Sequence, residues 1–584
     1  MGSLMPPVVQ NWISTIQSYI SPVYSRISAH MQEWSEYQTV VATIVAVLGT
    51  VYIALYRLQS VKRHPDEPPV VSAGVPFLGH LLGMALWGGR YVKGIGLKHR
   101  DKPVFTLPVP FSRIYVVTDP TLANAVQRAS KALSFMPLVP DITKRVLGFD
   151  AAHDAILRKD IDPEPGQPKG VLADLHDMVW NYLGPGQTLT DLSLRASREL
   201  ARQVNMYAEA HDRDPEVVSL LIWIRHFVAI STANFLYGPR NPLALQPELE
   251  DSFWDFDHGL GALLMGIFPS ITAGKAYRGR EALAKAFAEY LEDGRHNDEG
   301  VSPIIRKRIE LLLQHGFTLR EASRSEVSFL FAGIVNTATT TFWVVLHLFA
   351  RPDLLNYVRA ELLAGAVTEL DMGGDKPTRL LDQEALKTNC PTLMSVFRES
   401  LRVGSDFYST RLVKTDTLLA GRHFFAKDSV VQIAGGVIHA DTGIWGPSAD
   451  QFDPVRFIKL QQQQQSSSSA SSSSTNLTRE SSSSSTLSNA KDENEKVKGV
   501  HPAAFRAFGG GKTLCPGRHF ATHEILAFVA MIVLTVDLEA EGGGELVVPE
   551  KEDGVMPVHI LEPKTDVRVK VRVRKDGGEV VVVR

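Results

Sequence analysis

The chain has 584 residues, of which 44% are hydrophobic and 21% are charged, and its formal net charge is -3. This is the composition of a globular protein that is long enough for a large core, and the balanced charge gives no indication of nucleic-acid binding. The two cysteines, Cys390 and Cys515, are too few for a disulfide framework, so we expect the main body to occupy a reducing compartment. The sequence contains no zinc-type cluster of cysteines and histidines and no Walker loop.

An apolar segment near the N-terminus predicts a membrane anchor. Residues 1–38 form a leader whose pattern suits either a short interfacial helix or an unstructured lumenal segment. Residues 39–58 are predicted to be a single transmembrane helix, because only Arg57 interrupts an uncharged run close to the minimum length that spans a bilayer. Lys62 and Arg63 follow, so the positive-inside rule places the remainder of the chain in the cytosol.

The main body follows a proline-rich segment at residues 59–80, which is either a hinge or a plain linker. Residues 81–584 are predicted to be one large domain, mainly helical with a smaller β portion. The apolar segment 260–272, broken by Pro269, suits either the core or a surface that dips into a membrane. Helical patterns are recognised at residues 188–208, 216–237, 280–293 (a charged, amphipathic surface helix), 354–364, 395–402 and 521–536.

The longest apolar helix is predicted from Glu326 to Ala350. It resembles a membrane span in length, but asparagine and threonine side chains cluster near its middle. Polar groups at such positions need partners, which a helix buried inside a large protein finds in its neighbours. We therefore expect a buried helix here; its polar cluster comprises Asn336, Thr337, Thr339, Thr340 and Thr341.

Strand patterns and a low-complexity segment occupy the last third of the chain. Residues 409–413 and the strictly alternating residues 565–574 are predicted strands, and residues 579–583 are a candidate partner for the second one. Residues 460–498 are rich in glutamine and serine and are predicted to be a disordered surface insertion. The glycosylation sequon at Asn476 inside it should stay unused in the cytosol.

The most informative stretch is Phe508 to Arg518, FGGGKTLCPGR. The glycines allow the backbone to approach a flat, bulky group, and Phe508 can shield that group from water. Pro516 suits the first position of the following helix, whose N-terminus would stabilise a thiolate at Cys515. A lone thiolate held in this way suits haem iron better than zinc, whereas the simpler alternative is a buried free cysteine.

The pattern Phe508-x-x-Gly511-x-x-x-Cys515-x-Gly517 resembles the haem-binding loop of the cytochromes P450. The resemblance covers roughly residue 68 to the C-terminus apart from the insertion. It implies the mainly helical P450 fold, with haem b bound through the axial thiolate of Cys515. Further positions that match haem-contacting motifs of the family are Gly509, Lys512, Arg411, Ala332 and Gly333.

Two further family motifs match, and one does not. Glu399 and Arg402, with Arg456 of a Pro-x-Arg-Phe segment, correspond to the family's buried structural network. A Glu-x-x-Arg pair alone is most often a solvated surface pair, so the support comes from its position in the chain. The family often has a tryptophan–arginine pair that binds a haem propionate, but Trp180 is followed at that spacing by Gly184.

The distal helix departs from the usual family pattern, in which an acid and a threonine deliver protons. Here Val335 stands at the acid position and Asn336 at the alcohol position, which is similar to the sterol 7α-hydroxylase and prostacyclin synthase branch. An amide donates and accepts hydrogen bonds but relays a proton less simply than a hydroxyl does. The expected catalytic residues are Asn336, as an organiser of water or substrate, and its neighbour Thr337; a purely structural role for Asn336 is the alternative.

The resemblance implies a microsomal monooxygenase that oxidises a lipophilic molecule such as a sterol, terpenoid or other secondary metabolite. Electrons would come from NADPH through a separate cytochrome P450 reductase, and the chain would be anchored in the endoplasmic reticulum membrane by a single span. Lys512 and Arg518 are either a contact for that acidic partner or ordinary charges and propionate contacts. The alternatives are an isomerase or dehydratase that uses no oxygen or reductase, and a non-catalytic haem-binding sensor.

Overall fold

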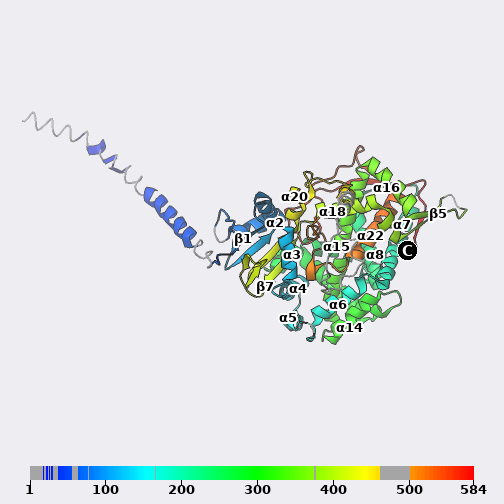
Figure 1. Cartoon of the computed structure of the whole chain (residues 1–584), viewed down its shortest axis with the longest axis horizontal. Coiled ribbons are helices and arrows are strands. Elements are labelled where there is room, and N and C mark those ends of the chain that lie inside the picture. The colour runs from blue at the N-terminus through cyan, green and yellow to red at the C-terminus, as the bar shows by residue number, and fades with distance from the viewer. Residues whose placement is uncertain are drawn as a thin grey trace, which may run out of the picture.

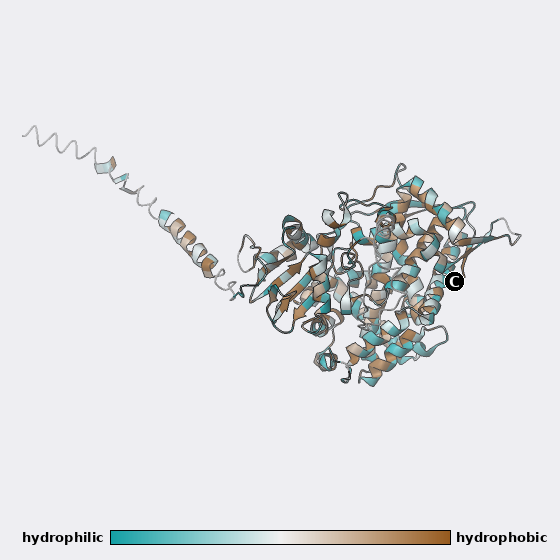
Figure 2. Cartoon of the chain, in the orientation of Figure 1, coloured by the Kyte–Doolittle hydropathy of each residue, from teal (hydrophilic) through white to brown (hydrophobic). Residues whose placement is uncertain are grey.

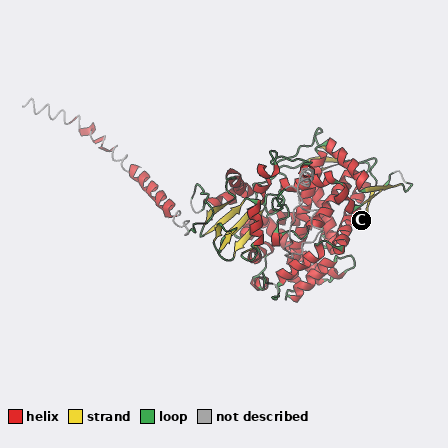
Figure 3. Ribbon diagram, viewed as in Figure 1, coloured by secondary structure: helices red, strands yellow, loops and turns green. Residues whose placement is uncertain are grey.

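The computed structural model describes residues 37–54, 63–75, 78–164, 166–373, 376–460 and 500–583, together with scattered residues between 18 and 29. Most of the leader and nearly all of the predicted insertion at 460–498 lie outside these residues. In the described part, a large helical body has a smaller β region at one side (Figures 1 and 3). The fold class expected from the sequence, mainly helical with a smaller β portion, is thus observed for the main body.

Helices are the predominant element among the described residues. Their bounds are α2 Gly79–Lys98, α3 Pro120–Arg128, α4 Val139–Leu147, α5 Ala151–Arg158, α6 Val171–Leu183, α7 Gln187–Ala210, α8 Leu220–Tyr237, α9 Pro242–Leu245, α10 Leu249–His258, α11 Leu260–Met265, α12 Pro269–Thr272, α13 Gly274–Glu292, α14 Pro303–Gln314, α15 Leu319–Phe349, α16 Pro352–Gly365, α17 Gln383–Asn389, α18 Pro391–Gly404, α19 Gly435–His439, α20 Thr442–Trp445 and α22 Arg518–Thr535.

The strands form four sheets. Their bounds are β1 Val104–Val109, β2 Ser112–Val117, β3 Leu133–Ser134, β4 Glu216–Ser219, β5 Val367–Leu370, β6 Thr378–Leu381, β7 Tyr408–Val413, β8 Thr417–Leu419, β9 His423–Phe425, β10 Val430–Ala434, β11 Val536–Ala540, β12 Arg568–Val573 and β13 Glu579–Val582. The largest sheet has the order β1-β2-β10-β7-β3, with β10 and β2 parallel and the other neighbours antiparallel. The smaller sheets are β11-β12-β4, β13-β6-β5 and β8-β9.

Helix α15 runs through the centre of the body and is the predicted buried helix. It packs against α8, α13, α18 and α22, and most of its residues are buried. It begins at Leu319, seven residues before the predicted start, because Thr318 and Glu321 form a capping box that satisfies the first backbone N–H groups. The four threonines of its polar cluster are buried and Asn336 is exposed, but the hydroxyls of Thr339 and Thr341 have no hydrogen-bond partner among the described residues, so the expected partners are found only in part.

Two sequence-based assignments are wrong at the edges of the sheets. Residues 216–219 were expected to begin a helix, but they form β4 and pair with β12. Residues 579–583 were expected to pair with the strand at 565–574, whereas β13 pairs in parallel with β6. Both errors concern partners that are far away in the sequence, and a local pattern carries no information about them.

Among the described residues, four helices are long and apolar enough to cross a membrane. Three of them, α8, α15 and α22, are largely buried inside the body, whereas none of the helix Tyr37–Ala54 is buried. Figure 2 shows that this N-terminal helix is mostly hydrophobic along its length. Length and composition thus agree with the predicted anchor at residues 39–58, and its membrane crossing stays a prediction.

The predicted network of one glutamate and two arginines forms in the interior. Arg402 donates from Nε and Nη2 to the two oxygens of Glu399, at 2.8 and 2.7 Å, and Arg456 Nε donates to Glu399 Oε1 at 3.0 Å. The remaining guanidinium N–H groups donate to the backbone carbonyls of five residues, which are His439, Trp445, Ser448, Ala449 and Gln451. The network therefore joins α18 to the segment that precedes the cysteine loop.

We predict that Glu399→Gln destabilises the protein by about 3–5 kcal/mol, because it leaves two buried guanidinium groups without a counter-charge. The measurement is urea denaturation of the detergent-solubilised full chain, followed by fluorescence. Asp177→Asn is the matched control, since it removes the half-exposed ion pair with Lys169, and such pairs contribute at most about 1 kcal/mol. Equal midpoints for the two variants would contradict this role for Glu399.

Candidate functional site

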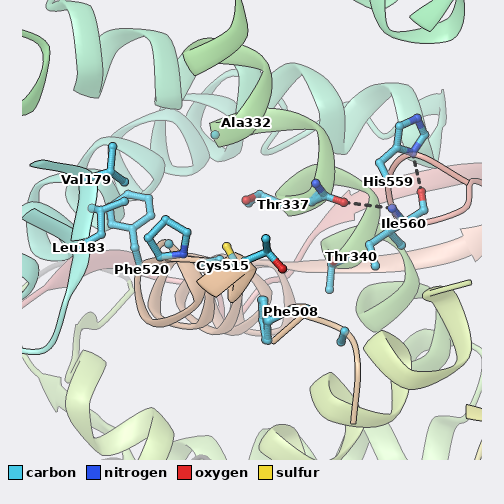
Figure 4. A pocket seen from close by; sticks show the side chains of 18 of the residues that line it. Val179, Leu183, Ala332, Thr337, Thr340, Phe508, Cys515, Phe520, His559 and Ile560 are labelled. Atoms are coloured by element: carbon cyan, nitrogen blue, oxygen red, sulfur yellow. Dashed lines mark hydrogen bonds between the residues drawn. The ribbon is translucent and has the colours of Figure 1, made fainter. Parts of the chain in front are cut away.

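A cavity of about 480 Å³ lies in the helical body between α15 and the cysteine loop. Its lining comes mainly from α6, α8, α15, α22 and β7, together with residues 507–509, 513, 515–517 and 558–560. Figure 4 shows Ala332 and Thr337 of α15 on one wall and Phe508 and Cys515 on the opposite one. The cavity thus brings together residues that are nearly 200 positions apart in the sequence.

The cysteine loop has the tight backbone that its glycines suggest. The N–H of Cys515 donates to the carbonyl of Phe508 at 2.9 Å, which closes the loop. Gly509 and Gly511 have φ of 78° and 62°, in the left-handed region that favours glycine. Phe508, Gly509, Cys515 and Gly517 line the cavity, whereas Gly511 supports the loop from outside the lining.

The protonation of Cys515 differs from the sequence-based expectation. Helix α22 begins at Arg518 rather than at Pro516, so the cysteine lies three residues before the helix. Burial raises the pKa of the Cys515 thiol, although a hydrogen bond from the Gly517 backbone and the charge of Arg518 act in the opposite direction. The protein alone therefore keeps a thiol here, and a thiolate requires the additional positive charge of a bound metal.

Two buried arginines lie next to this loop and have no carboxylate partner among the described residues. Arg411 on β7 donates to the carbonyls of Thr410 and Gly510 and to the Thr513 hydroxyl. Arg506 donates to Ser409 Oγ at 2.9 Å and faces the side-chain amide of Gln127. Burial lowers the pKa of each arginine to about 10, and the charge of Arg411 adds to the effect on Arg506.

This donor set fits a haem. A haem carries two propionate carboxylates, and guanidinium groups bind carboxylates with two parallel hydrogen bonds. A pair of buried cations without a counter-ion is costly, and an anionic group at the cavity edge removes that cost. Arg411 is the residue that the family resemblance indicates; Arg506 was missed, and its signal was an arginine two positions before Phe508.

Two basic residues predicted near the cofactor occupy different places. Lys512 is exposed, outside the cavity lining, with Nζ 3.6 Å from Asp162. Arg518, for which a partner contact, an ordinary charge and a propionate contact were all open, is buried, donates to the Cys515 carbonyl and lies 5.2 Å above the Trp180 ring. The arginine that accompanies Trp180 thus comes from α22 and not from position 184.

On the distal wall, Ala332, Gly333, Asn336 and Thr337 all line the cavity, as predicted. Asn336 is exposed to this space, and its Oδ1 accepts a hydrogen bond from the backbone N–H of Ile560 at 3.0 Å. The amide oxygen is therefore occupied by the protein, and the Nδ2 group has no protein partner among the described residues. Asn336 thus bonds the core and also faces the cavity, and its role as an organiser of water or substrate stays a prediction.

A buried acid next to Thr337 was missed by the sequence analysis. Glu524 of α22 is buried, accepts from Thr232 Oγ1 at 3.5 Å and interacts with the Thr337 hydroxyl. Burial raises the pKa of Glu524 to about 8, so the carboxyl group holds a proton at neutral pH. The available signal was the single acid of this helix, which directly precedes its long apolar run and lies nine residues after Cys515.

The comparisons agree with this site. The family model of the cytochromes P450 matches residues 262–565, about half of the chain. Cytochrome P450 monooxygenase nodJ of Hypoxylon pulicicidum is 30% identical over 513 residues, which cover 88% of this chain and 91% of that protein. Cholesterol 7-alpha-monooxygenase of Cricetulus griseus is 25% identical over 342 residues, covering 56% of this chain and 59% of that one.

Solved structures show the same fold. A retinoic-acid-bound cyanobacterial cytochrome P450 is 18% identical and superposes with a TM-score of 0.59, covering 87% of this chain and 99% of that one. A second cytochrome P450 crystal structure is 19% identical with a TM-score of 0.60, covering 88% and 100%. The family model and the similarity to nodJ, together with the cysteine loop and the paired arginines, show that the chain belongs to the cytochrome P450 family of monooxygenases.

Proposed function

We propose that this monooxygenase oxidises a lipophilic small molecule, a sterol, terpenoid or related secondary metabolite, with O₂ and with electrons that a separate reductase takes from NADPH. The observation that carries the proposal is the single cavity that joins Cys515, Arg411 and the distal residue Asn336 between largely apolar walls. The relatives include fungal P450 monooxygenases and cholesterol 7-alpha-monooxygenase, and this similarity supports a lipophilic substrate.

Cys515, Arg411 and Arg506 would hold the haem b, with Ala332, Gly333 and Phe508 against its faces. When bound, the haem supplies the activation of O₂, and a thiolate ligand favours O–O cleavage. The chain's own residues perform the remaining tasks. The apolar walls exclude water and bind the substrate, and the polar residues near Asn336 orient it and supply protons.

The orientation of Asn336 assigns it a specific task in this proposal. Because its Oδ1 accepts from Ile560, its Nδ2 group is the part that can serve a ligand, and Nδ2 is only a donor. Asn336 would therefore hold a substrate oxygen or an ordered water by donating to it. Proton supply would fall to Thr337 and the protonated Glu524, whose hydroxyl and carboxyl groups interact.

An exposed apolar surface of the main body is a candidate membrane contact. Exposed apolar side chains gather where α2, α11 and α12 meet the loop around Val555, whose carbonyl accepts from the N–H of Gly89 at 2.9 Å. The segment 260–272 is thus exposed in part rather than core. Together with the helix Tyr37–Ala54, this surface would rest on the cytosolic face of the endoplasmic reticulum; its members are Leu81, Leu82, Leu86, Trp87, Met265, Ile267, Phe268, Ile271, Val555 and Met556.

The reaction class is tested by single-turnover experiments on the full chain with extracts of candidate lipids. We expect product only when NADPH, the reductase and O₂ are all present. Product formed without them would replace the proposal by an isomerase or dehydratase. Intact haem spectra with no substrate-dependent NADPH consumption across the panel would instead favour a haem-binding sensor.

Arg506→Leu is expected to weaken haem binding by about 10- to 100-fold, because a charged hydrogen bond contributes about 1.5–3 kcal/mol. The measurement is haem transfer to apomyoglobin from the purified full chain. Lys512→Leu is the matched control, since this residue lies on the same loop but outside the cavity lining. Faster haem loss from the Lys512 variant than from the Arg506 variant would reverse the two assignments.

Glu524→Gln keeps the shape of the side chain but removes its transferable proton. We expect product formation to fall by on the order of 10²-fold while NADPH is still consumed and hydrogen peroxide is released. The raised pKa also means that the folded state of the parent loses stability as pH rises from 4.5 to about 8, because the unfolded chain ionises first. The variant should lack this loss, and parallel pH–stability curves would contradict the assignment.

A further inference from the structure

The loop at residues 558–562 forms part of the cavity wall next to Asn336 and contains a histidine with a polar contact at each ring nitrogen. His559 Nδ1 lies 2.8 Å from the carbonyl oxygen of Ile560, and Nε2 lies 3.3 Å from Asp257 Oδ1. Both ring nitrogens thus face acceptors. A neutral imidazole has a single N–H, so both contacts are satisfied only by the protonated ring.

The charges around His559 agree with this state. Burial alone would lower the pKa of His559, but the hydrogen bond and charge of Asp257, with the charge of Glu562, raise it overall. Asp257 on α10 is fully buried, and neither of its oxygens makes a well-aligned hydrogen bond among the described residues, so its closest cationic contact is His559 Nε2 at 3.3 Å. The imidazolium is therefore the main compensation for a carboxylate that the fold has removed from water.

Other charges also face this cluster. Arg225 of α8 bonds Glu562 and lies 3.9 Å from Asp257, while His258 Nε2 lies 3.5 Å from Glu562. Ligand atoms of Asp257, His559 and Glu562 lie within 4.8 Å of one another, which is close enough for a metal ion. The Arg225 guanidinium already supplies the positive charge, so we infer no metal here.

The backbone of Ile560 connects this histidine to the distal helix through the two successive peptide groups on either side of its Cα. Its carbonyl accepts from His559, and its N–H donates to Asn336 Oδ1 (Figure 4). One residue further on, the carbonyl of Leu561 accepts from Trp343 Nε1 at 2.8 Å. The loop is thus attached to α15 at two points, and only the first of them involves the cavity-facing amide.

We propose that His559, held by Asp257, is a positioning residue for Asn336: through the backbone of Ile560 it fixes the amide with Oδ1 engaged and Nδ2 available to the cavity. The proposal rests on the function proposed above for Asn336. It makes α10 and α15 jointly responsible for presenting a hydrogen-bond donor, so the substrate or water oxygen that faces Asn336 must be an acceptor.

The proposed positioning of Asn336 should be present at low pH and lost at high pH. The folded pKa of His559 lies above its ordinary value, so the complete chain of bonds exists below that pKa and is lost as pH rises through it. When the ring loses a proton, the carboxylate of Asp257 keeps the one on Nε2. The Nδ1 lone pair then opposes the Ile560 carbonyl, and the peptide that holds Asn336 is released.

The test is the infrared C–O stretching band of the ferrous carbonyl complex of the detergent-solubilised full chain, recorded across pH. Carbon monoxide is the probe, because its frequency follows the field of nearby N–H groups and needs no known substrate. The parent should show one band at low pH and a second that grows as pH rises. His559→Phe should show only the high-pH band at every pH.

Two further variants complete the test. Asp257→Asn can donate to Nε2 and leave the proton on Nδ1, so the low-pH band should persist at high pH. Trp343→Phe frees the same loop at Leu561 without touching Asn336, and the parent's pH dependence should be unchanged. If Trp343→Phe alters the band as His559→Phe does, or if neither histidine-cluster variant alters it, the positioning role is wrong.

Asn336→Leu separates this inference from the proposed function beneath it. A band that stays in place in Asn336→Leu shows that the amide does not serve the cavity, and the proposed role of Asn336 fails. The other outcome is that the band shifts in Asn336→Leu, whereas His559→Phe and Asp257→Asn keep the pH dependence of the parent. That result overturns only the positioning by His559.

Discussion

Charges buried in the helical body must be compensated there, and this constraint organises both the fold and the site. Glu399 compensates Arg402 and Arg456 within the polypeptide and joins α18 to the segment before the cysteine loop. Arg411 and Arg506 have no such carboxylate among the described residues. A haem that brings two propionates would therefore complete the electrostatics of the fold, and its binding would stabilise the native state by mass action.

The proposed mechanism separates two tasks that neighbouring residues perform in the usual acid–threonine pattern of the family. Asn336 would offer a donor in a fixed orientation, because the Ile560 backbone occupies its oxygen. The proton would be held instead by Glu524, which interacts with Thr337 from α22. Val335, at the acid position, is free to be apolar and is fully buried in the core.

The sequence predicted features whose cause is local or whose motif is contiguous. The long buried helix, the strand at Arg411, the cysteine loop and the Glu399–Arg402 pair belong to this group. It did not predict features that depend on contacts between distant segments, such as the pairing of β13 with β6. Glu524, Arg506 and His559 were missed for the same reason, since burial and neighbours give each its chemistry, and neither is visible in a single sequence.

The burial of α8, α15 and α22 has a consequence for biosynthesis. Each of these helices resembles a membrane span by length and composition, as the helix Tyr37–Ala54 does. If the N-terminal helix is the predicted anchor, a ribosome would deliver it to the translocon first, with basic residues just behind it to fix its orientation. The later segments would then have to be withheld from lipid until they pack together, so the order of synthesis, as well as hydropathy, would decide which apolar helix enters the bilayer.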